Sequence, residues 1–171
     1  EETRKELTAI KDDPAEIEER FYQNLEFGTA GLRGILGAGT NRMNIYTVAW
    51  AAEGFASYVD ELGDEAKERG IAISYDSRHY SPEFAEVAAC IFAKHKIKVH
   101  LYPELRPVPM LSFAVRYFNC VGGIMITASH NPKEYNGFKA YGEDGSQLAP
   151  EAADIVMAKM NEIDDITTLS W

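Results

Sequence analysis

The sequence predicts one α/β domain of three layers, in which helices cover both faces of a mixed, mainly parallel sheet of about four strands. The chain has 171 residues, which suits one domain with a real core. From residue 44 onward, short apolar runs typical of strands alternate with longer segments of helical periodicity. No internal repeat or second-domain boundary interrupts this alternation. We therefore expect residues 1–171 to form a single domain.

Two helical pieces are expected before the alternation begins. Residues 2–25 have helical character, and the step from Asp13 to Pro14 should divide them, because proline suits the first position of a helix. The next segment contains five glycines between Gly28 and Gly39. It is expected to form a loop and then a short strand or hairpin around residues 34–38.

The alternating part of the chain predicts four strands and four helices. Asn44 should cap the first of these helices, and Ser81 should cap the second, with Pro82 at its first position. The last two strands are separated by a connection too short for a helical crossover, so we expect them to be antiparallel. The predicted helices cover residues 45–62, 81–96, 107–118 and 150–163, and the predicted strands cover 70–76, 97–102, 120–127 and 136–141.

Composition excludes several classes of protein. The net charge of −10 argues against a nucleic-acid partner, which requires clustered Lys and Arg, but does not exclude a small phosphate-bearing ligand. No apolar run has the length of a membrane helix, and the charged N-terminus does not resemble a signal peptide. Cys90 and Cys120 both lie in apolar runs and are expected to be core residues of an intracellular, cytoplasmic protein.

A polar segment, Thr127–Pro132 with the sequence TASHNP, follows the predicted strand 120–127. Ligands of α/β sheets bind beyond the carboxyl ends of the strands, so Ser129 should reach such a site. If Ser129 were the nucleophile of a hydrolase, it would need a histidine as a base. The segment TASHNP does not match the G-x-S-x-G pattern of such enzymes. His130 is adjacent and should point away in extended backbone. The remaining histidines, His79, His95 and His100, show no acidic partner in the sequence.

Alternatively, Ser129 carries a phosphoryl group, which brings nearly two negative charges and needs cations and amide donors nearby. His130, Asn131 and Lys139 lie in or beside the loop, and Arg33 could approach from the glycine-rich segment. A purely structural interpretation remains open: TASHNP could be a capped surface turn. The acid and base of SYDSR, residues 74–78, could equally form an ion pair at a strand end.

Four segments together resemble the α-D-phosphohexomutase family, which includes phosphoglucomutases and phosphomannomutases. FGTAGLRG begins at Phe27, YDSR at Tyr75, TASHNP at Thr127 and NGFKAY at Asn136. They occur in the order of the family's first domain and extend across nearly the whole chain. The segment GAGTNRMN, residues 37–44, is most similar to the branch of bacterial phosphoglucomutases and phosphopentomutase-type enzymes.

The resemblance implies a role for each matched residue. Ser129 would be the phosphoserine that exchanges its phosphoryl group with a sugar phosphate. The reaction would convert a 1-phosphate to a 6-phosphate through a bisphosphorylated sugar, with glucose the expected sugar and glucose 1,6-bisphosphate the intermediate and activator. Lys139 would transfer a proton, His130 and Asn131 would orient the phosphoryl group, and Arg33 would hold charge near it. The Ser129 phosphate would be one ligand of Mg²⁺.

The family's metal-binding segment D-G-D-x-D-R does not occur in this sequence. Mg²⁺ is therefore expected to bind weakly or not at all to this chain alone. The resemblance implies the first domain of a longer enzyme, inactive without its later domains, which would be its partners together with the phosphosugar. An apolar face exposed by their absence could cause self-association. The alternative is a non-catalytic phosphosugar-binding or interaction module of the same fold, which tight binding of phosphosugars by this chain alone would favour.

Overall fold

The computed structural model describes residues 2–28 and 31–171, and its centre is a sheet in the order β1-β5-β4-β2-β3. β2 pairs in parallel with β3 and β4, whereas β5 is antiparallel to β4 and β1. The expected mixed sheet is confirmed, with one strand more than expected and as many antiparallel as parallel ladders. The strands are β1 Gly31–Ile35, β2 Ile71–Tyr75, β3 Val99–Leu101, β4 Gly122–Ile126 and β5 Tyr135–Gly142.

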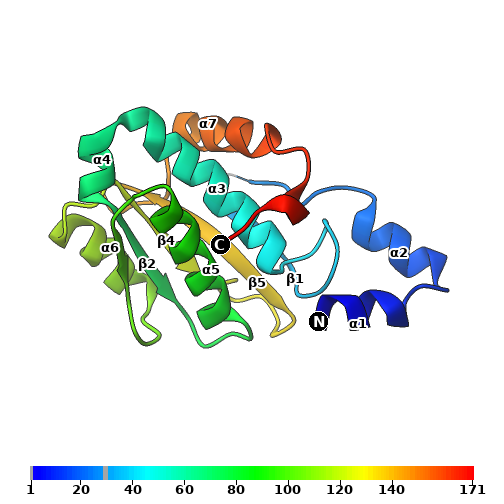
Figure 1. The fold of residues 1–171 in the computed structure, drawn as a ribbon. Coiled ribbons are helices and arrows are strands. Elements are labelled where there is room, and N and C mark those ends of the chain that lie inside the picture. Colours follow the sequence, from blue (N-terminus) through cyan, green and yellow to red (C-terminus); the bar gives the residue numbers. More distant parts are fainter. Residues whose placement is uncertain (1, 29–30) are drawn as a thin grey trace.

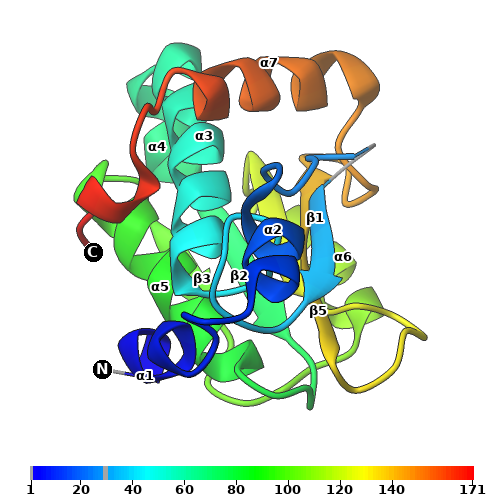
Figure 2. The ribbon, with the colours of Figure 1, turned by 90° about the vertical axis from the view of Figure 1, so that its right-hand side faces the viewer.

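Helices cover both faces of the sheet, as Figures 1 and 2 show. Ile124 and Ile126 of β4 belong to a core with α3, α5 and α7, whereas Met125 between them packs with α6 on the other face. This alternation follows from the two-residue period of a strand and confirms the three layers. The helices are α1 Glu2–Ala9, α2 Pro14–Phe21, α3 Ile45–Leu62, α4 Asp64–Arg69, α5 Ser81–Lys94, α6 Val108–Tyr117, α7 Pro150–Asn161 and the 3₁₀ helix η1 Ile166–Thr168.

Helix caps show where local sequence rules succeed and where they fail. Asn44 caps α3 as expected, accepting hydrogen bonds from the backbone N–H groups of Tyr46 and Thr47. Ser81, however, is the first residue of α5 and not its cap, because Tyr80 precedes it with φ +63°. The Ser81 hydroxyl instead donates to Asp76 Oδ1 over 3.0 Å. The sequence did not predict α4, which lies between Gly63 and Gly70, both with positive φ.

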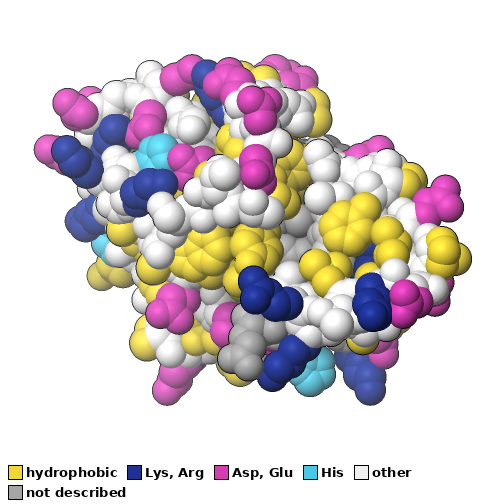
Figure 3. All heavy atoms as spheres, turned by 45° about the vertical axis from the view of Figure 1, so that its right-hand side comes forward, with side chains coloured by type: hydrophobic (Ala, Val, Ile, Leu, Met, Phe, Trp, Pro, Cys, Tyr) yellow, Lys and Arg dark blue, Asp and Glu magenta, His cyan; other side chains and the backbone are white. Residues whose placement is uncertain are grey.

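The N-terminal helices are divided at Pro14, as expected, but lie at the edge of the molecule (Figures 1 and 2). Ile17 and Phe21 of α2 are exposed. Figure 3 shows hydrophobic side chains at the surface on the side where these helices lie. Arg20 of α2 forms ion pairs with Glu6 and Glu16, so charged contacts help to hold α1 and α2 together.

The expectations for Cys90 and His95 are wrong. Cys120 is buried, but Cys90 is exposed, because it lies on the solvent-facing side of α5. His95 does have acidic partners: its Nδ1 lies 2.6 Å from Asp60 Oδ2 and its Nε2 lies 2.8 Å from Glu53 Oε1. Both acids belong to α3, so their proximity depends on the packing of α3 against α5. Along residues 2–28 and 31–171, no helix combines the length and apolarity that a membrane crossing demands.

Candidate functional site

Ser129 lies at the carboxyl end of β4, where the sheet edge was expected to present it. Its side chain is exposed, and its backbone has φ +57°, in the left-handed region that few residues other than glycine adopt. Two hydrogen bonds hold this turn. Ser129 N–H donates to Thr127 Oγ1 over 3.0 Å, and Asn131 N–H donates to the Ala128 carbonyl over 3.1 Å. The hydroxyl is therefore presented to solvent by an ordered turn.

His130 lies close to Ser129, although the sequence predicted that its side chain would point away. Its Nδ1 is 3.4 Å from Ser129 Oγ, whereas extended backbone would have turned the two side chains apart. The positive φ of Ser129 is the reason, because the chain is not extended at this residue. An imidazole at this distance can donate a hydrogen bond to an oxygen on Ser129, or accept one from its hydroxyl.

The segment from Thr127 to Tyr135, which contains Ser129 and joins β4 to β5, is called the serine loop. Arg33 contacts this loop from the glycine-rich strand β1. In the β1–β5 ladder Arg33 is opposite Gly137, one residue before the buried Phe138. The exposed Arg33 side chain donates from Nη1 to Asn131 Oδ1 over 3.0 Å, so the predicted approach of Arg33 to the loop is observed. Of the segment FGTAGLRG, Thr29 and Ala30 lie outside the described residues.

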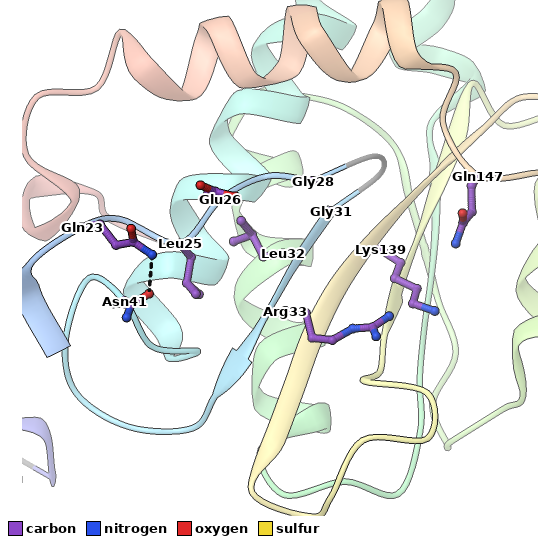
Figure 4. Close-up of a pocket in the computed structure, with 10 residues that line it drawn as sticks. All are labelled: Gln23, Leu25, Glu26, Gly28, Gly31, Leu32, Arg33, Asn41, Lys139 and Gln147. Carbon is purple, nitrogen blue, oxygen red and sulfur yellow. Dashed lines mark hydrogen bonds between the residues drawn. The ribbon is translucent and has the colours of Figure 1, made fainter. Parts of the chain in front are cut away.

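Lys139 and Arg33 point to the same side of the sheet, as Figure 4 shows. They are diagonal neighbours on β5 and β1, and both line a cavity of about 560 Å³ whose other polar side chains include Gln23, Asn41 and Gln147. Burial of Lys139, together with the nearby positive charge of Arg33, lowers the pKa of its ammonium group below the usual value. Ser129 and His130 are not among the residues that line this cavity.

Two glycines let the strands that carry these residues approach each other closely. Gly31 has φ +146°, and a Cβ atom there would lie 1.9 Å from the Phe138 carbonyl oxygen. At Gly137 a Cβ atom would lie 2.7 Å from the Thr127 carbonyl and 2.8 Å from that of Leu32. Glycine at these positions therefore keeps β1, β5 and the end of β4 in contact.

Asp76 and Arg78, at the end of β2, form the ion pair that the sequence allowed, with Arg78 Nε 3.4 Å from Asp76 Oδ2. The sequence did not show that Arg78 also contacts the serine loop, since Nη2 donates to the Ser129 carbonyl over 2.9 Å. The order of the strands could have indicated this contact, because β2 and β4 are parallel neighbours and their carboxyl ends meet at one edge of the sheet.

The described residues around Ser129 do not form a complete binding site for Mg²⁺. Near Ser129, the Asp76 carboxylate already accepts hydrogen bonds from Ser81 and Thr127 and pairs with Arg78. No group of three or more His, Cys, Asp and Glu side chains within residues 2–28 and 31–171 is arranged to hold a metal. Mg²⁺ prefers several oxygen ligands in near-ideal octahedral geometry, and the described residues around Ser129 offer too few of them.

Comparisons with known proteins agree on one family. Residues 24–167 match the family described as phosphoglucomutase/phosphomannomutase, alpha/beta/alpha domain I. A phosphoglucomutase of Staphylococcus epidermidis is 51% identical over 138 residues, which are 81% of this chain and 25% of that protein. A phosphoglucomutase of Staphylococcus aureus is 46% identical over 153 residues, which are 88% of this chain and 27% of that protein. The chain thus spans about a quarter of the length of these curated relatives.

Solved structures give the same result. A crystal structure described as a phosphomannomutase from Thermus thermophilus is 32% identical, with a TM-score of 0.74, covering 84% of this chain and 31% of that one. A phosphoglucomutase/phosphomannomutase family protein from Burkholderia thailandensis is 21% identical, with a TM-score of 0.64, covering 80% of this chain and 30% of that one, which supports the fold alone. The chain therefore belongs to the phosphoglucomutase/phosphomannomutase family, of which it contains the α/β/α domain I.

Proposed function

We propose that this chain is the nucleophile-bearing domain of a phosphosugar mutase, a longer enzyme that interconverts sugar 1-phosphates and 6-phosphates. The observation that carries the proposal is the exposed hydroxyl of Ser129 on an ordered turn, with His130 at 3.4 Å and with Asn131 bonded to Arg33. Phosphoryl transfer requires positioning and neutralisation of charge on the transferred oxygens, and these side chains suit both tasks.

In the proposed reaction, phosphorylated Ser129 transfers its phosphoryl group to the 6-hydroxyl of a sugar 1-phosphate. The bond from phosphorus to Ser129 Oγ breaks, a bond to the sugar oxygen forms, and the hydroxyl proton leaves to a base. The bisphosphorylated sugar then turns around and returns its 1-phosphoryl group to Ser129. The sum is an isomerisation that restores the phosphoserine and consumes no other reactant.

Lys139 is the proposed proton-transfer group. Its lowered pKa makes loss of its proton easier, and the resulting amine could accept the hydroxyl proton and return it in the second half of the cycle. Arg33 and His130 would neutralise the phosphoryl oxygens, and Asn131 would help to orient them. Mg²⁺, when held with the help of ligands beyond this chain, would neutralise further charge on the transferred group. Glucose is the proposed sugar, and the protein is proposed to be cytoplasmic.

One experiment tests this function in the complete protein. Phosphosite mapping by mass spectrometry should find phosphate on Ser129, and Ser129→Ala should abolish conversion of glucose 1-phosphate to glucose 6-phosphate. Ser77→Ala is the matched control, since Ser77 is an exposed serine beyond the carboxyl end of β2, at the same sheet edge. Phosphate found elsewhere, or full activity of Ser129→Ala, would reject the proposal. Mannose 1-phosphate in the same assay tests the choice of sugar.

The short distance between Ser129 and His130 also favours a second candidate, a serine hydrolase, more than the sequence did. His130 has no carboxylate partner among its hydrogen bonds in the described part of the chain, so the third member of a triad is missing there. A fluorophosphonate probe decides between the two functions, because it labels an activated hydrolase serine. We expect Ser129 to remain unlabelled.

A further inference from the structure

Arg78 is bonded to the backbone of the serine loop at four points. Nη2 donates to the carbonyls of Ser129 over 2.9 Å and Asn131 over 2.7 Å. Nη1 donates to the carbonyls of Pro132 over 2.8 Å and Tyr135 over 3.0 Å. One guanidinium group therefore spans the loop from the serine to the first residue of β5. No other arginine donates to as many carbonyls of one loop among the hydrogen bonds of the described residues.

The four Nη donors of this guanidinium are all used by the loop. The four Nη hydrogens face the four carbonyls, and Nε lies 3.4 Å from Asp76 Oδ2. The Arg78 side chain is only 13% exposed. Arginine has five N–H donors and no acceptor, so the loop takes the four Nη donors of Arg78, and the Nε side of the group forms an ion pair with Asp76. In this it differs from Arg33, which is exposed and available to a ligand.

The bonds from Arg78 to the loop form a clamp, and Asp76 connects this clamp to the other side of the turn. Its Oδ2 accepts from Thr127 Oγ1 over 2.6 Å, and Thr127 Oγ1 in turn accepts from Ser129 N–H over 3.0 Å. The Thr127 hydroxyl has one hydrogen, which it donates in its hydrogen bond to Asp76. Its oxygen can therefore accept the hydrogen bond from Ser129 N–H. The N–H and the carbonyl of Ser129 are thus both fixed by the strand end that carries Asp76 and Arg78.

The clamp has a consequence for the opposite side of the loop. In a trans peptide unit the N–H points away from the carbonyl, and the structure contains no cis peptide among its described residues. Since the carbonyls of Ser129 and Pro132 face Arg78, the N–H groups of His130 and Lys133 face away from it. Neither N–H has a hydrogen-bond acceptor within the described residues. Backbone N–H groups that point outward in this way can bind the oxygens of a phosphoryl group.

We propose that Arg78, supported by Asp76 and Thr127, is the positioning residue of Ser129. It never contacts the substrate; it holds Ser129 at positive φ and turns the N–H groups of His130 and Lys133 toward the phosphoryl group. This inference rests on the proposed function for its catalytic meaning. The holding of the loop, however, can be measured independently of catalysis.

The first test measures the loop itself, by amide hydrogen exchange in the complete protein. Arg78→Lys keeps the charge, but an ammonium group has three donors on one nitrogen and cannot span four carbonyls. We expect exchange at the Ser129 and Asn131 N–H groups to accelerate at least about tenfold. Arg69→Lys is the matched control, because Arg69 also donates to backbone carbonyls, those of Asn119 and Cys120, at the opposite end of β4.

The second test measures catalysis. Displacement of a reacting group by about 1 Å costs about 100-fold in rate, so Arg78→Lys should lower kcat about 100-fold with little change in KM. In Arg78→Ala, guanidinium ion should restore part of kcat, whereas sodium chloride at equal ionic strength should not. A general loss of stability would not respond to guanidinium in this way.

The outcomes separate the two proposals. Unchanged exchange at Ser129 and Asn131 in Arg78→Lys would overturn the clamp, and wild-type kcat in that variant would overturn its role in positioning Ser129 for catalysis. A loss of kcat equal in Arg78→Lys and Arg69→Lys, without guanidinium rescue, would overturn it too. Faster exchange in Arg78→Lys together with full activity of Ser129→Ala would instead reject the proposed function, while the exchange result still supported the clamp.

Discussion

Arg33 Nη1 donates a hydrogen bond to Asn131 Oδ1 over 3.0 Å, although the two residues are 98 positions apart in the chain. This bond joins β1 to the serine loop and places a permanent positive charge beside both Asn131 and Lys139. Arg33 thereby has two effects on one site: it orients the amide of Asn131, and it disfavours a second positive charge on Lys139.

The first prediction concerns the pKa of Lys139 in Arg33→Met. Burial and the charge of Arg33 both lower this pKa in the wild type, so removing the charge should raise it toward 10.5. Titration of the lysine by NMR with labelled Nζ or Cε measures the shift. Arg33→Lys retains the charge and should leave the pKa lowered. An unchanged pKa in Arg33→Met would show that Arg33 does not act on Lys139.

The position of Ser129 could be predicted from the sequence, whereas the contacts that hold it could not. An apolar run followed by TASHNP placed the hydroxyl at the carboxyl end of a strand, because ligands of α/β sheets bind there. Its contact with His130 depends on φ +57° at Ser129, and backbone conformation at a single non-glycine residue is not visible in sequence. The bonds from Arg78 to the loop join residues more than fifty positions apart.

Gly137→Ala is predicted to destabilise the sheet beneath the site. Its Cβ would lie 2.7 Å from the Thr127 carbonyl and 2.8 Å from that of Leu32, and backbone atoms on both sides cannot yield as a flexible side chain can. Overpacking of this kind costs about 1–3 kcal/mol of unfolding free energy. Chemical denaturation measures the loss.

Gly28→Ala is the control for this prediction, because among the described residues beyond its chain neighbours the nearest atom to its Cβ would be the Gly31 carbonyl oxygen, 3.9 Å away. Its unfolding free energy should remain within about 0.5 kcal/mol of the wild type. Equal stability of the two variants would mean that β1, β5 and the end of β4 have more room than the structure shows.

His95→Ala should destabilise the contact between α3 and α5. Both ring nitrogens of His95 face carboxylates, those of Asp60 and Glu53, and the His95 and Glu53 side chains are 15% and 16% exposed. Removing the ring leaves two carboxylates with fewer partners in a partly buried place, which costs about 1–3 kcal/mol. His79→Ala is the control, since the His79 side chain forms no hydrogen bond among those of the described residues. Similar melting temperatures for His95→Ala and the wild type would contradict the prediction.

The same contact predicts an acid-dependent loss of stability. Burial alone would raise the pKa of Asp60, but hydrogen bonds and charge from Lys67 and His95 outweigh it and hold this pKa below its usual 3.8. A carboxyl group whose pKa is lowered by folding stabilises the folded state above its unfolded pKa. That stabilisation is lost as the pH falls through the folded pKa. The wild type should therefore lose this contribution progressively as the pH falls through 3.8 and below, and His95→Ala should show a smaller loss in the same range.

The two cysteines should differ strongly in reactivity toward a thiol reagent. Cys90 is exposed on α5, whereas Cys120 is buried and its burial raises the pKa of its thiol to about 11. Only the thiolate reacts, and at pH 8 a thiol of that pKa has about one part in a thousand as thiolate. In the folded protein we expect iodoacetamide to modify Cys90 and to spare Cys120, so Cys90→Ser should be inert and Cys120→Ser should react like the wild type. Modification of both residues in denaturant is the control for access. Rapid labelling of Cys120 in the folded protein would show that the core between β4 and α6 opens, because neither its burial nor the raised pKa allows reaction in the closed state.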